Sequence, residues 1–175
     1  MPKLKPFAYV VMILVGEGGA GPHDIVRMMQ DGRWYWSGSD SQFYAEPKRL
    51  EKLGLLSSHS EPGITKARTV YQLTDKGRKA LVEWLAEPSN MPRIQEEQVA
   101  RLLGSEYVDD RTTIESVRPL RARFEAELDA ITRHEARIAE FPHRERPLRI
   151  NLRLQRRMIE AHIAWLDEVE AEYGG

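Results

Sequence analysis

The sequence predicts a mainly α-helical protein with one small β-hairpin and two domains. Apolar residues recur at helical spacing over most of the 175 residues. Strand-like alternation of polar and apolar residues occurs around residues 55–73. A Pro-containing segment at residues 87–92 separates this half from a second half in which every basic residue other than His is Arg. We therefore predict one domain at residues 1–88 and another at residues 89–175.

Two helices are expected before the hairpin. The first carries an apolar stripe and ends in the Gly-rich run 16–21. The second starts at Pro22, because the missing N–H of proline costs little at the first helical position. Ile25, Met28 and Met29 of this helix should face inward. The apolar stripe of the first helix consists of Leu4, Phe7, Ala8, Val11, Leu14 and Val15.

A third helix is expected between Ser39 and Gly54. Ser39 and Gln42 have the spacing of a capping box, in which the Ser hydroxyl accepts from an early helical N–H and the Gln side chain reaches back. Gly54 can adopt the positive φ that ends a helix. Pro47 lacks the N–H of a regular helix interior, so the helix is either kinked there or divided in two. The residues expected to face the core are Phe43, Leu50 and Leu53.

A hairpin is expected after the third helix. Residues 55–58 suit a short strand, residues 61–67 are turn-rich, and residues 69–73 alternate like a half-exposed strand. Thr74 is a good N-cap for a fourth helix. This order of helix, hairpin and helix is the core of a winged helix-turn-helix, a fold that places one helix in the major groove of DNA and a basic loop beside it.

The N-terminal half resembles the PadR family of transcriptional regulators over about residues 4–86. The resemblance implies a homodimeric, sequence-specific DNA-binding regulator that represses transcription by occupying promoter DNA. Two positions depart from the family's pattern: Gly21 is followed by Pro22 where the family often has Tyr, and Pro47 replaces a common leucine. The residues that carry the resemblance are Tyr44, Lys48, Arg49, Leu50, Glu51, Gly54, Leu55, Tyr71, Leu73, Thr74 and residues 77–81.

The residues expected to contact DNA lie on the third helix and the hairpin. The whole chain has a net charge of −1, but residues 42–79 hold eight basic and four acidic residues, a local net charge of +4. Because attraction to phosphate depends on the local face, the small total charge does not exclude DNA binding. The expected DNA-binding residues are Gln42, Tyr44, Lys48, Arg49, Lys66 and Arg68.

Composition limits the other function classes. The chain has no Cys, which excludes disulfides and thiolate metal sites. No apolar run approaches the ~20 residues that span a bilayer, so no membrane partner is expected. Residues 1–6 do not begin a signal peptide, and a cytoplasmic location is expected. The His residues show no metal-ligand or catalytic spacing, so we expect no metal, no cofactor and no enzymatic activity.

The C-terminal domain is expected to consist of amphipathic helices that dimerise, and its pattern also resembles the helical domain of PadR-type regulators. A stripe runs from Ile114 to Ile138, with an irregularity at Pro119. In the last helix, apolar residues recur every seven positions, the spacing of a helix–helix seam. Two such helices cannot make a roomy core alone, so a twofold dimer should bury them. The expected dimer-interface residues are Leu152, Ile159 and Leu166.

The aromatic segment Trp34, Tyr35 and Trp36 precedes the third helix and has two interpretations. Either the rings pack against the core and the C-terminal half, or Trp34 and Trp36 bind a small apolar or aromatic effector beside the helix that reads DNA.

The function of the whole chain also has two interpretations. It is either a regulator that binds double-stranded operator DNA or a winged-helix protein-interaction adaptor that does not read DNA. Salt-dependent binding to the DNA upstream of its own coding sequence would separate the two.

Overall fold

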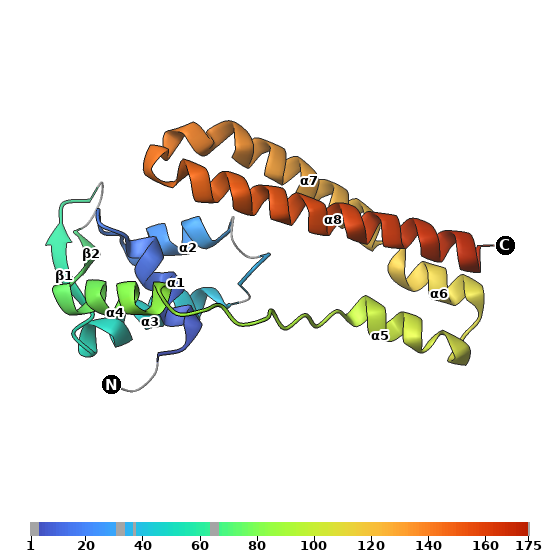
Figure 1. Cartoon of the computed structure of the whole chain (residues 1–175), viewed down its shortest axis with the longest axis horizontal. Helices are drawn as coiled ribbons and strands as arrows, with labels where there is room; N and C mark the ends of the chain where they lie inside the picture. The colour runs from blue at the N-terminus through green and yellow to red at the C-terminus, as the bar shows by residue number, and fades with distance from the viewer. Residues whose placement is uncertain (1–3, 31–33, 37, 64–66, 175) are drawn as a thin grey trace. The chain divides into compact units, whose positions relative to one another are not determined.

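A computed structural model describes residues 4–30, 34–36, 38–63 and 67–174 of the chain. The chain divides into two compact units, Met1–Met91 and Pro92–Gly175. Both units are mainly helical, and a two-stranded antiparallel hairpin belongs to the first (Figure 1). The fold class predicted from the sequence, mainly α with one small hairpin, is confirmed.

The first unit has the element order expected of a winged helix. Strand β1 pairs with β2 from Leu56 opposite Leu73 to Glu61 opposite Arg68. The elements of this unit are α1 (Pro6–Val15), α2 (Pro22–Gln30), α3 (Asp40–Lys52), β1 (Leu56–Glu61), β2 (Arg68–Leu73) and α4 (Asp75–Leu85).

Helix α1 forms the centre of this unit and contacts α2, α3, α4 and β2. Helix α3 buries Phe43 and Leu50 in the core, and the Phe43 ring packs against Phe7 with a centroid distance of 4.9 Å. Tyr9 of α1 stacks on Trp84 of α4 with a centroid distance of 4.5 Å. The burial of Phe43 and Leu50 determines which face of α3 remains exposed. The buried residues of α1 are Ala8, Val10, Val11, Met12 and Val15.

The local signals predicted for α3 are found in the structure. Ser39 and Gln42 form both hydrogen bonds of the capping box, and Gly54 has a φ of 70° just after the helix. Pro47 does not divide the helix, which runs from Asp40 to Lys52 with the proline buried inside it. Pro47 cannot donate to the Phe43 carbonyl, but its ring adds apolar burial to the core.

Strand β2 departs from the alternation that its sequence predicts. Val70 and Tyr71 are both buried, although they are neighbours in the strand. Ala20, in the loop before α2, extends the edge of the hairpin through two backbone hydrogen bonds of 3.0 Å with Tyr71. These bonds bring the neighbouring Gly19 onto Val70, because a Cβ atom at Gly19 would lie 3.1 Å from Val70 Cγ1. This loop therefore covers the side of β2 that simple alternation would leave exposed.

The base of the hairpin is closed at the Leu55 junction, which consists of Leu55, Thr74 and Gly77. The Leu55 carbonyl oxygen accepts from the Thr74 hydroxyl at 3.1 Å and from the Thr74 N–H at 3.2 Å. The Thr74 hydroxyl accepts from the Gly77 N–H at 3.0 Å, which confirms Thr74 as an N-cap. Lys76 donates to the Leu53 carbonyl at 2.6 Å. The first turn of α4 therefore holds the C-terminal end of α3.

The second unit is built on one long helix, and Pro119 separates α6 from α7 at the irregularity expected from the sequence. In the described part of the chain, no helix is long and apolar enough to cross a membrane. The elements of this unit are α5 (Glu97–Leu103), η1 (Ser105–Tyr107), α6 (Asp110–Val117), α7 (Leu120–Arg137), η2 (Ile138–Glu140), η3 (Pro142–Arg144) and α8 (Glu145–Tyr173).

Helix α8 packs on α6 and α7 within the same chain. The contact with α7 includes ion pairs from Arg156 to Glu135 at 2.9 Å and from Arg121 to Asp167 at 2.5 Å. Among the residues buried in this unit are the three that the sequence assigns to a dimer interface, namely Leu152, Ile159 and Leu166. Their burial does not require a second chain.

The close packing at Gly77 leads to a prediction about stability. A Cβ atom at Gly77 would lie 2.0 Å from the Leu55 carbonyl oxygen, so Gly77→Ala should lower the free energy of unfolding by about 1–3 kcal/mol, as core overpacking does. Gly18→Ala is the matched control, because its Cβ would meet no heavy atom within 4 Å. Urea denaturation of both variants measures the difference, and equal stability would contradict so close an approach.

Candidate nucleic-acid interface

Helix α3 presents one continuous exposed face opposite its buried residues. The capping box sets where the helix begins, and the burial of Phe43 and Leu50 sets its rotation about its own axis. Three of the six exposed side chains on this face are cations, so it can attract an anion. The residues that line the face are Ser41, Tyr44, Ala45, Lys48, Arg49 and Lys52.

Gln42 lies at the N-terminal end of α3 and takes part in the cap. Its side-chain oxygen accepts from the Ser39 N–H at 2.9 Å, while its own backbone N–H donates to the Ser39 hydroxyl at 3.4 Å. Within the described residues, the cap engages only the carbonyl oxygen of the Gln42 amide, which also carries two N–H donors. Gln42 can therefore cap α3 and still donate to a partner.

Arg49 is paired with an acid on its own helix. Its Nε and Nη2 atoms donate to the two carboxylate oxygens of Glu46 at 2.9 and 2.5 Å, in the fork geometry typical of strong Arg–carboxylate pairs. The hydrogen bonds with Glu46 raise the pKa of Arg49. The Glu46 side chain is only 14% exposed, so much of the positive charge of Arg49 is compensated within the protein.

The two lysines on the same face differ from Arg49. Among the described residues, neither Lys48 nor Lys52 has an ion-pair partner, and both are exposed. The Tyr44 hydroxyl lies 3.5 Å from His23 Nδ1, so Tyr44 bridges from α3 to α2. The exposed, uncompensated charge of α3 therefore belongs to its lysines.

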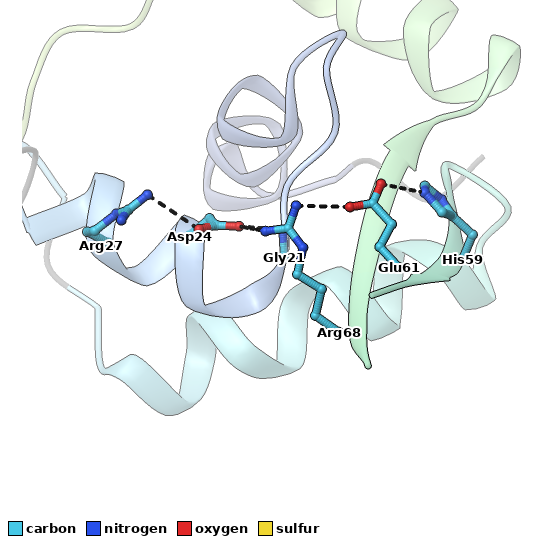
Figure 2. Close-up of polar contacts among 6 residues, drawn as sticks. All are labelled: Gly21, Asp24, Arg27, His59, Glu61 and Arg68. Atoms are coloured by element: carbon cyan, nitrogen blue, oxygen red, sulfur yellow. Dashed lines mark hydrogen bonds and ion pairs between the residues drawn. The ribbon is translucent and has the colours of Figure 1, made fainter. Parts of the chain in front are cut away.

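The hairpin carries the second group of predicted DNA-binding residues. Lys66 lies outside the described residues. Arg68 lies at the start of β2, where one guanidinium nitrogen donates to Glu61 at 2.9 Å and another to Asp24 at 3.4 Å. Figure 2 shows Arg68 between these two carboxylates, one from α2 and one from β1.

The pairs around Arg68 form a chain that we call the wing network, which consists of Arg27, Asp24, Arg68, Glu61 and His59. Asp24 accepts from Arg27 at 3.4 Å, and Glu61 accepts from His59 Nε2 at 2.9 Å. The hydrogen bond from His59, followed by that from Arg68, lowers the pKa of Glu61. The Glu61 carboxylate is thus available as an acceptor at neutral pH.

A cavity of about 900 Å³ lies between the start of α1, the aromatic segment and α3. Of the two tryptophans predicted to bind an effector, Trp36 lines this cavity, whereas the half-buried Trp34 is not among the lining residues. Arg49 lines both the cavity and the exposed face of α3. The other lining residues include Lys5, Phe7, Tyr35 and Gln42.

His162 has two polar contacts within the second unit. His162 Nε2 lies 2.9 Å from Glu96, and its Nδ1 lies 2.6 Å from the Met158 carbonyl oxygen. Among the described residues, no group of three or more His, Asp or Glu side chains is placed to hold a metal ion.

Three acidic residues of this interface were missed by the sequence reasoning. Glu46 and Arg49 are three residues apart on one helix, a spacing that does indicate a pair. Asp24 lies 44 residues from Arg68, and no local signal predicts that contact. Glu61 pairs with Arg68 across the hairpin register, which only the exact ends of the strands define.

Comparison with known proteins identifies both units. Residues 24–83 match the transcriptional regulator PadR-like family, and residues 94–173 match the C-terminal domain of virulence activator alpha. The negative transcriptional regulator PadR of Bacillus subtilis is 28% identical over 92 residues, which are 51% of this chain and 50% of that protein. The match to this curated relative therefore spans half of its length.

Solved structures match the fold over nearly the whole chain. Bacillus subtilis PadR in complex with operator DNA has a TM-score of 0.84 at 19% identity and covers 97% of this chain and 99% of its own. The same protein in complex with p-coumaric acid has a TM-score of 0.78 at 18% identity, covering 98% and 100%. The Vibrio cholerae virulence activator AphA has a TM-score of 0.74 at 24% identity, covering 95% and 97%.

Proposed function

This chain is a member of the PadR-like family of transcriptional regulators, and on that premise we propose that it binds double-stranded operator DNA and represses transcription by occupying a promoter. The family consists of transcriptional regulators and not of enzymes. Repression is supported by the Bacillus subtilis relative, which is described as a negative regulator. DNA as the partner is supported by the crystal structure of that relative with its operator.

The observation that carries this proposal is the exposed face of α3, where Lys48 and Lys52 have no ion-pair partner among the described residues. A helix of this kind fits the major groove, and residues near its N-terminus reach base edges. Gln42 and Tyr44 occupy that end and are proposed to contact bases, with Gln suited to adenine. Lys48 and Lys52 are proposed to contact phosphates. Arg49 would have to leave Glu46 before it could bind a guanine.

The proposed functional form is a homodimer assembled through the second unit. Leu152, Ile159 and Leu166 are covered by their own chain. We therefore propose that they hold α8 in place within that chain, beneath the surface that contacts the second subunit. Apolar side chains that remain exposed in this unit are candidates for the contact itself, because a second copy would remove them from water. They include Leu103, Tyr107, Ile150 and Leu154.

The proposed signal is a small aromatic acid bound in the cavity beside α3. Phe7, Tyr35 and Trp36 supply apolar and aromatic walls, and Lys5 supplies a positive charge. The carboxylate on the lining, Glu46, is paired with Arg49. The complex of Bacillus subtilis PadR with p-coumaric acid supports this chemical class of effector. A ligand in this cavity would touch Arg49 of α3, so its affinity for the free and the DNA-bound protein would differ, as an effector requires.

The first test compares charge variants on α3. Lys48→Ala should weaken binding to the upstream DNA and reduce the slope of log K against log salt by about 0.9, the value for one lost phosphate contact. Glu46→Gln should strengthen binding, because it removes the charge that holds Arg49. Arg133→Ala, on the exposed surface of α7, is the control for loss of one charge. Fluorescence anisotropy at several salt concentrations measures all of them.

Two outcomes of this experiment would count against the proposal. An unchanged slope for Lys48→Ala would remove α3 from the DNA interface. The absence of salt-dependent DNA binding in the unmodified protein would favour an interaction adaptor over a regulator.

The second test separates assembly from folding. Leu154 is 50% exposed, so Leu154→Glu should dissociate the dimer while the second unit stays folded. Ile159 has no exposed surface within one chain, so Ile159→Glu buries an unpaired carboxylate and should unfold the unit by itself. Sedimentation gives the assembly state, and circular dichroism gives the folding. A normal dimer of Leu154→Glu would place the interface elsewhere.

The third test locates the effector with p-coumaric acid as the probe. Binding should change the tryptophan fluorescence of the unmodified protein and of Trp34→Phe, but the change should be much smaller in Trp36→Phe. The probe should also weaken DNA binding, by about 1–3 kcal/mol if the coupling is typical. A Trp36→Phe variant that responds like the unmodified protein would exclude the cavity.

A further inference from the structure

The two ends of the hairpin are held in different ways. Its base is held at the Leu55 junction, and the middle of β2 is held by the backbone hydrogen bonds between Ala20 and Tyr71. Its far end is the pair Glu61 and Arg68, the last pair in the register before the turn. At that end, the side-chain contacts of the wing network reach from the hairpin to α2.

Asp24 is a well-fixed anchor for this far end. It lies in the first turn of α2, and its Oδ2 atom accepts from the Gly21 N–H at 3.2 Å. The same oxygen accepts from Arg68 at 3.4 Å, while Oδ1 accepts from Arg27 at 3.4 Å. The backbone also approaches closely here, because a Cβ at Gly21 would lie 3.0 Å from the Thr69 carbonyl oxygen. The start of α2 and the start of β2 are therefore neighbours.

Arg68 connects this anchor to the hairpin with both arms of its guanidinium group. One terminal nitrogen faces Asp24 on α2 and the other faces Glu61 on β1. We infer that Arg68 is a positioning residue, which sets the angle of the wing against α2, and that it is not a contact to DNA. The inference rests on the proposed function, since it assigns a role within DNA binding, and it replaces the DNA contact expected for Arg68 from the sequence.

Electrostatics support this assignment. A DNA phosphate that contacted Arg68 would have to compete with the carboxylates of Asp24 and Glu61, which already bind its guanidinium group. Phosphates brought near Asp24 and Glu61 would also be repelled by them if Arg68 left. The planar fork of Arg can reach two acceptors at once, whereas Lys offers a point charge on a flexible stem. Arg68→Lys therefore keeps the charge and should lose the bridge.

The experiment measures wing mobility and DNA binding in the full-length protein. The variants are Arg68→Gln, Arg68→Lys and Asp24→Asn, with Arg27→Gln as the control that removes the other partner of Asp24 without touching the hairpin. Mobility is read from ¹⁵N relaxation of the amides of residues 61 and 68 in the free protein. DNA affinity and its salt slope are measured on a duplex that the unmodified protein selects from a random pool.

A positioning role predicts that the three test variants raise wing mobility and weaken DNA binding by about two- to fivefold, the effect of losing an exposed ion pair. The salt slope should stay unchanged, and combining Asp24→Asn with Arg68→Gln should add little to either change alone. Arg27→Gln should behave like the unmodified protein.

The proposal is overturned if Arg68→Gln lowers the salt slope by about 0.9 and Asp24→Asn strengthens binding, because both results indicate a phosphate contact. Normal DNA affinity in all variants would also overturn it. If the unmodified protein binds no DNA at any salt concentration, the proposed function fails instead, and the mobility of the wing still decides whether Arg68 positions it.

Discussion

The burial of one face of α3 against α1 is the constraint on which the rest of the first unit depends. Phe43, Pro47 and Leu50 must leave water together, and this fixes the rotation of the helix. The opposite face then has to be exposed, and it carries Lys48 and Lys52. The Leu55 junction ends α3 at a defined residue and places the hairpin directly beside it. The packing of the core therefore determines which side chains of α3 form the candidate DNA interface.

The positive charge that this interface can offer to DNA depends more on which cations are paired with carboxylates than on the composition of the chain. The chain is almost neutral, and its two predicted DNA-binding arginines are held by carboxylates, Arg49 by Glu46 and Arg68 by Glu61 and Asp24. Lys48 and Lys52, which have no ion-pair partner in the described part of the chain, supply the available positive charge. A modest local charge of this kind gives weak attraction per subunit, and the proposed dimer would strengthen binding by joining two such faces.

Local features were predictable from the sequence, and contacts between distant residues were not. The capping box at Ser39, the positive φ of Gly54 and the break at Pro119 each depend on a few neighbouring residues, and each is found. The burial of Val70 depends on the loop at Gly19 and Ala20, and the role of Arg68 depends on Asp24, both far away in the sequence. The seven-residue stripe of α8 correctly indicated a helix seam, but periodicity cannot tell whether the partner helix belongs to the same chain.

The Leu55 junction also bears on how such a protein can diversify. It joins residues 19 positions apart and so closes the hairpin as a loop whose ends are already fixed. The entropy of closing a flexible loop grows slowly, by about 0.6 kcal/mol for each doubling of its length. Residues can therefore be inserted at the tip of the wing with little loss of stability. The length and chemistry of the tip can therefore differ between related proteins while the fold below it stays the same.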